Sequence, residues 1–139
     1  MISQGWRIMA DKHNMAAISR QMALEAVARH HGPLVADRLE RLRVKVERLL
    51  VWCVALGYTL EDGGAGVYLR AEASICGDEP AGYEMSARCP VNMRELAGPA
   101  IDEARLAQLA QFDAEHLASG LARGFLAATH RPAEVSDGG

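Results

Sequence analysis

The sequence predicts an α+β, helix-dominated fold with two N-terminal helices, a β-hairpin, and then one or two C-terminal helices. Two kinds of pattern support this prediction. Apolar residues recur in steps of three and four over residues 34–57 and, less regularly, over 14–31 and 101–129, which is the spacing of one helix face. Apolar and polar residues alternate over 67–75 and again over 83–91, as in strands with one buried face.

The first predicted helix covers residues 14–31, with Asn14 as its N-cap. Gly32 and Pro33 end this helix and begin the next, because proline is tolerated in the first turn of a helix. Its apolar face consists of Ile18, Met22, Ala23, Val27 and Ala28.

The second predicted helix runs from Leu34 to Gly57, where glycine is a natural stop. Further apolar residues, including Leu50 and Val54, widen its stripe beyond a two-position seam, so we expect it to pack into a globular core and not into an isolated coiled coil. The heptad-like positions are Val35, Leu39, Leu42, Val46, Leu49, Cys53 and Leu56.

A turn-rich stretch over 58–66 leads into the predicted hairpin, whose strands are joined by a loop over 76–82. In the simplest register Ile75 faces Tyr83, which places Cys89 opposite Leu69. We therefore expect no disulfide between Cys76 and Cys89 across this hairpin. Two strands alone are marginally stable, so their apolar face should lie on the helices or on a second copy of the chain.

Asn92 followed by Glu95 indicates a capped short helix over 93–97. The last helix should begin near residue 100 or 101, bend or break at Ser119 and Gly120, and end near 129. Its predicted apolar face consists of Leu106, Leu109, Ala110, Phe112, Leu117, Leu121 and Phe125.

At 139 residues the chain fits a single domain covering 1–139. We expect its ordered core to extend from about residue 14 to about 129, and the segments 1–13 and 130–139 to be frayed.

The charges are unevenly distributed, since residues 1–60 carry a net charge of +4 and residues 61–139 a net charge of −7. Cations spaced by three or four residues form one row on the second helix, which we call the basic stripe. Asp37, Glu40 and Glu47 dilute it, and no aromatic residues are interleaved with it to stack on bases. The residues of the basic stripe are Arg38, Arg41, Lys45 and Arg48.

No sequence motif indicates catalysis, a cofactor or a metal. His30 and His31 lack further ligands at workable spacing, so we interpret them as cations at a helix C-terminus. Asp113 and His116 form an i,i+3 pair, but no nucleophile is identifiable beside them. Since we predict a partly buried His116 with a local hydrogen bond, an enzyme is the least favoured class.

The favoured hypothesis is a small cytosolic protein that binds another protein, as an assembly, adaptor or inhibitory subunit. Its binding surface would be the basic stripe, with Asp78 and Glu79 as a second patch. The alternative is a nucleic-acid-binding regulator that uses the basic N-terminal half. A homodimer is a further hypothesis, and we expect no membrane segment, no cofactor and no metal. We expect a cytoplasmic location, because the three cysteines do not resemble the disulfide framework of a secreted protein.

Overall fold

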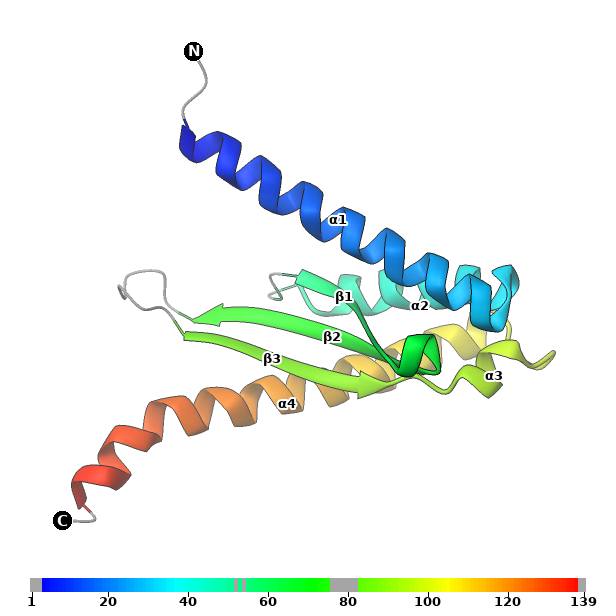
Figure 1. The fold of residues 1–139 in the computed structure, drawn as a ribbon. Helices are drawn as coiled ribbons and strands as arrows, with labels where there is room; N and C mark the ends of the chain where they lie inside the picture. The colour runs from blue at the N-terminus through cyan, green and yellow to red at the C-terminus, as the bar shows by residue number, and fades with distance from the viewer. Residues whose placement is uncertain (1–3, 52, 54, 76–82, 138–139) are drawn as a thin grey trace.

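The elements follow the predicted order with one additional strand (Figure 1). The structure, a computed structural model, describes residues 4–51, 53, 55–75 and 83–137. It confirms an α+β, helix-dominated fold with two N-terminal helices, strands, and C-terminal helices. The elements are α1 (Gln4–His31), α2 (Pro33–Leu49), β1 (Ala55–Glu61), the 3-10 turn η1 (Asp62–Gly64), β2 (Gly66–Ile75), β3 (Tyr83–Pro90), α3 (Met93–Ala97) and α4 (Glu103–Asp137).

The strands form one antiparallel sheet in the order β1-β2-β3. Leu69 pairs with Cys89 and Ile75 with Tyr83, so the predicted register of the hairpin is confirmed. Cys76 lies outside the described residues.

Strand β1 is absent from the sequence prediction, and the predicted helix over 34–57 is too long. Helix α2 ends at Leu49. The chain then enters β1, in which Leu56, Tyr58 and Leu60 alternate toward the core. Leu56 satisfies the heptad spacing and also the two-residue period of a strand, so the helical pattern extends past the real end of the helix.

The fold has two main layers, a sheet and the pair α2 and α4 on one of its faces (Figure 1). Helix α1 packs along α2 and contacts β1 and η1. The opposite face of the sheet is polar. Arg88 bonds Glu61 at 2.7 Å and lies over the ring of Tyr68, 5.0 Å from its centroid. Arg70 pairs with Glu72 at 3.2 Å. Arg70, Glu72 and Arg88 are exposed on this face, whereas the side chain of Arg20 from α1 lies over Gly57 of β1.

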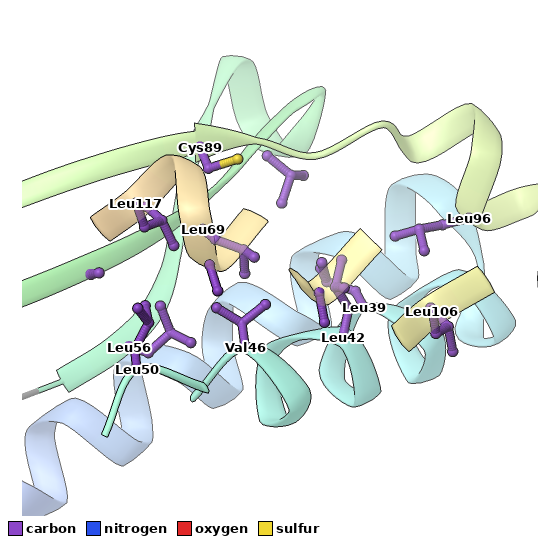
Figure 2. Close-up of a cluster of buried hydrophobic side chains, with 14 of the residues drawn as sticks. Leu39, Leu42, Val46, Leu50, Leu56, Leu69, Cys89, Leu96, Leu106 and Leu117 are labelled. Carbon is purple, nitrogen blue, oxygen red and sulfur yellow. The ribbon is translucent and has the colours of Figure 1, made fainter. Parts of the chain in front are cut away.

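The core lies between the layers, where side chains from α2, the sheet and α4 point toward one another (Figure 2). Burying one such side chain contributes roughly 1.5–3 kcal/mol. The sequence prediction is confirmed for most of the α2 stripe, but Leu49 is exposed and Leu50 takes its place in the core. The largest fully buried side chains are Leu39, Leu42, Leu56, Leu69, Leu96, Leu117, Leu121, Val27 and Val46.

Helix α1 is longer than predicted. It begins at Gln4, so Asn14 lies inside the helix and is not its N-cap. Val27 is buried, whereas Ile18 and Met22 are exposed. Figure 1 shows the reason, since the N-terminal half of α1 diverges from the rest of the molecule. An apolar stripe predicts burial only where another element runs alongside it.

Helix α4 is continuous through Ser119 and Gly120, so the helix does not break there, and it extends to Asp137, so part of the expected frayed tail is helical. A Cβ atom at Gly120 would lie 2.9 Å from Cβ of Ala87 on β3. This glycine therefore allows close packing of the helix on the sheet. On the predicted apolar face, Phe112 and Phe125 are exposed, whereas Ala114, which was not predicted to belong to that face, is buried.

Candidate functional site

Arg38 of the basic stripe is a structural residue. Its Nη1 donates hydrogen bonds to the carbonyl oxygen of Leu96 at 2.6 Å and to that of Gly98 at 3.0 Å. These carbonyls lie at the C-terminus of α3, where backbone oxygens lack helical partners. Arg38 thus ties α3 to α2. The Asn92 side chain accepts from the backbone N–H of Glu95 at the other end of α3, as predicted.

The rest of the basic stripe is mostly paired with carboxylates. Arg41 contacts Asp37 at 3.0 Å and Glu103 at 3.1 Å, and Lys45 contacts Glu103 at 3.1 Å. Lys45 and then Arg41 hold the pKa of Glu103 below its usual range. Arg48 is exposed and has no ion pair within the described part of the chain. The stripe therefore presents much less free positive charge than its sequence indicates.

The second predicted patch, Asp78 and Glu79, lies outside the described residues.

A buried polar network between α2 and β1 was missed in the sequence. Arg43 is only 7% exposed. It binds Glu40 through Nε and Nη2 at 2.9 and 2.8 Å, and Glu47 through Nη1 at 2.7 Å. The hydroxyl of Tyr58 also donates to Glu40. The sequence signal for this network was the placement of two carboxylates, with Glu40 three residues before Arg43 and Glu47 four residues after it.

The electrostatics of this network favour its charged form. The hydrogen bond from Arg43 is the main cause that lowers the pKa of Glu40, and the bond from Tyr58 adds to it. Burial, and then the adjacent Glu40, raise the pKa of Tyr58, which keeps its hydroxyl a donor. Among the described residues, no fully buried side-chain nitrogen or oxygen lacks a hydrogen-bond partner, and this includes the atoms of the network.

A cleft of about 480 Å³ lies among the described residues, and we call it the α3–α4 cleft. It lies between α3, α4, the end of β3 and one residue of α2. Phe112, at 64% exposed, stands among its lining residues, and Leu42 and Leu96 are buried. The apolar lining is Leu42, Pro90, Val91, Leu96, Leu109 and Phe112, and the polar lining is Asn92, Glu95, Arg105, Gln108 and Asp113.

Asp113 contributes a buried carboxyl group to this cleft, being only 6% exposed. Its Oδ1 accepts a hydrogen bond from Sγ of Cys89 at 3.4 Å, and Cys89 points into the core from β3 in Figure 2. Burial is the main cause that raises the pKa of Asp113; Glu95 raises it further, whereas Cys89 and His116 lower it. Burial and then Asp113 raise the pKa of Cys89 to about 12, so this thiol remains protonated.

The expected pairing of Asp113 with a partly buried His116 is wrong in its geometry. His116 is exposed, and the hydrogen bond that Asp113 accepts comes from Cys89. Spacing of i,i+3 places two residues on one side of a helix but does not decide which of them faces the core.

An ion pair flanks the cleft. Arg105 donates from Nε and Nη2 to the two oxygens of Glu95, the second at 3.1 Å, and from Nη1 to Oε1 of Gln108 at 3.2 Å. All three of its donor nitrogens are engaged, so the guanidinium group of Arg105 is fixed beside the cleft.

No family model matches the chain, and no curated protein or solved structure is significantly similar to it. The described residues contain no group of three or more His, Cys, Asp or Glu side chains placed to hold a metal ion. Nor does any helix in the described ranges have the length and apolar character needed to cross a membrane.

We expect Asp113→Asn to raise the free energy of unfolding at neutral pH by on the order of 1 kcal/mol, because it removes a buried charge that has no salt bridge to a described residue. Because the pKa of Asp113 is raised in the native protein, the unfolded chain loses the carboxyl proton of Asp113 at a lower pH than the native protein does. Stability should therefore fall as pH rises from the ordinary aspartate value of 3.8 through the native pKa.

Urea unfolding at a series of pH values measures this effect. Glu115→Gln removes one charge from an exposed position on the same helix and should change neither stability nor its pH profile. A pH profile of Asp113→Asn identical to that of the native protein would contradict the prediction.

Proposed function

We propose that the protein functions by binding another protein, a segment of which docks in the α3–α4 cleft. The supporting observation is the exposure of Phe112 beside a mostly apolar cleft. Aromatic residues next to apolar pockets are frequent sites of high binding energy in protein interfaces. The cleft volume of about 480 Å³ fits one or two side chains of a partner.

The charge distribution supports a protein partner over a nucleic acid. Glu103 pairs with both Arg41 and Lys45, and Arg38 is engaged with α3. A phosphate backbone needs cations that are free to replace its counterions. Arg48 alone is a weak basis for such binding, so the regulator that binds nucleic acid is the less favoured proposal.

An assembly, adaptor or inhibitory role in the cytoplasm remains our expectation for such a binding module. In this proposal the α3–α4 cleft replaces the basic stripe as the principal contact surface, because two of the stripe residues are already paired with one carboxylate.

Affinity purification from the lysate of the source organism, after nuclease treatment, tests the function. Phe112→Ser should lower the recovery of a stoichiometric protein partner by at least about tenfold, since it removes an aromatic contact at the cleft. Met22→Ser is the matched control, because Met22 and Phe112 are both 64% exposed and α1 does not line the cleft.

Three outcomes are informative. A partner lost with Phe112→Ser and retained with Met22→Ser supports the proposal. Equal recovery by both variants overturns the cleft as the binding surface. Nucleic acid that copurifies without nuclease and is released at high salt overturns protein binding in favour of the alternative.

A further inference from the structure

We propose that the α3–α4 cleft selects an arginine side chain of the partner segment and that Asp113 receives its guanidinium group. This inference rests on the proposed function and specifies the chemistry of the segment that is bound. It follows from the state of the carboxyl group, from the charges around it and from the lining of the cleft.

The carboxyl group of Asp113 is incompletely satisfied. It is 6% exposed, it lines the cleft, and the hydrogen bond it receives from the described residues comes from the thiol of Cys89. A thiol is a weak donor, whereas a carboxylate has about four acceptor sites on its two oxygens. No described basic side chain forms a salt bridge with Asp113. The group therefore retains most of its capacity to bind a cation.

Arg105, the basic residue that lines the cleft, is engaged elsewhere. Arg105 binds Glu95 through two nitrogens and Gln108 through the third. The lining of the cleft thus contains two carboxylates and one guanidinium group, which leaves it with net negative charge. Charge complementarity requires that the compensating cation come from the ligand.

The apolar lining fits the stem of an arginine side chain. Arginine buries its methylene groups against apolar surface while its charged end finds a carboxylate. Val91, Leu96 and Leu109 supply such surface beside Asp113. A planar guanidinium group also matches a carboxylate with two parallel hydrogen bonds, which an ammonium group cannot do. The cleft therefore favours arginine over lysine.

Two blocked dipeptides test the inference on the full chain. The probes are N-acetyl-leucyl-arginine amide and N-acetyl-leucyl-citrulline amide, which has nearly the same shape but no charge. Each is titrated to millimolar concentration while amide resonances are followed by two-dimensional NMR. We expect the arginine peptide to bind at least about fivefold more tightly, with shifts at Gln108 and Asp113 of the cleft.

In Asp113→Asn the ratio of the dissociation constants of the citrulline and arginine peptides should fall to nearly one. In Glu115→Gln, the exposed control on α4, this ratio should be unchanged. Far-ultraviolet circular dichroism establishes that both variants are folded. If Asp113→Asn did not fold, the comparison of the two peptides on the native protein would still decide the matter, together with the location of the shifted resonances.

The outcomes separate this inference from the proposed function. Equal binding of both peptides in the cleft overturns arginine selection and leaves the binding function standing. A preference that persists in Asp113→Asn overturns Asp113 as the receiving group. Resonance shifts that lie outside the cleft, or no shifts with either peptide, overturn arginine recognition in the α3–α4 cleft. The binding function is then decided by the affinity purification with Phe112→Ser.

Discussion

Replacing Arg43 with alanine is expected to lower the free energy of unfolding by about 2–3 kcal/mol. The substitution removes the common partner of Glu40 and Glu47 and leaves a hole between α2 and β1, where Arg43 also donates to the carbonyl oxygen of Leu56 at 3.4 Å. The side chains of Glu40 and Glu47 are 37% and 51% exposed, so they can turn toward water. For that reason we expect a smaller loss in the free energy of unfolding than breaking a wholly buried ion pair would cause.

Urea unfolding at neutral pH measures this loss, with Arg48→Ala as the control on an exposed face of the same helix. Since the native pKa of Glu40 is lowered, the stability gained from its pairing is present above the ordinary glutamate value of 4.5 and is lost as pH falls through the native value. The difference between native protein and Arg43→Ala should therefore shrink in acid. A loss no larger than that of Arg48→Ala would show that the network adds nothing to stability.

Gly64→Ala is expected to cost about 2–4 kcal/mol, because it combines backbone strain with a collision. Gly64 has a φ of +108°, a conformation that side-chain-bearing residues rarely adopt, and an added Cβ would lie 2.7 Å from Cδ2 of His30. The backbone here is also fixed from α1, since Nε2 of His31 donates to the carbonyl oxygen of Gly64 at 3.0 Å. The turn thus cannot shift without loosening this contact.

Thermal and urea unfolding of Gly64→Ala and of Gly66→Ala separate these causes. An added Cβ at Gly66 meets its nearest atom at 3.5 Å, an ordinary contact, and Gly66 has no positive φ, so this control should be nearly neutral. The double variant Gly64→Ala with His30→Ala removes the collision and retains the strain, so it should recover part of the loss. Equal stability of Gly64→Ala and Gly66→Ala would refute the strain argument.

Local patterns predicted the parts of the fold that depend on neighbouring residues. The register of β2 and β3 follows from their alternation, and α3 follows from the Asn92 cap. The end of α2 could not be predicted in the same way, because Leu56 fits a helix and a strand equally well. The pairing of β1 with β2 decides between them, and the apolar spacing within residues 34–57 carries no information about that pairing.

The site depended still more on long-range contacts. A row of cations was visible in the sequence, but the carboxylate of Glu103, which neutralises Arg41 and Lys45, is far away in the chain. The burial of Asp113 likewise depends on where β3 crosses α4. Charge spacing along one helix therefore predicts a surface feature but not whether that surface remains free.

The bond from Arg38 to the end of α3 also has a consequence for folding. A helix of five residues is too short to persist alone in water, so α3 depends on contacts such as those that Arg38 of α2 makes with its carbonyl groups. We therefore expect one wall of the α3–α4 cleft to form only after the two halves of the sequence have met. A ligand that binds the cleft and not the unfolded chain would stabilise the whole protein by an amount that grows with the ligand concentration relative to its dissociation constant.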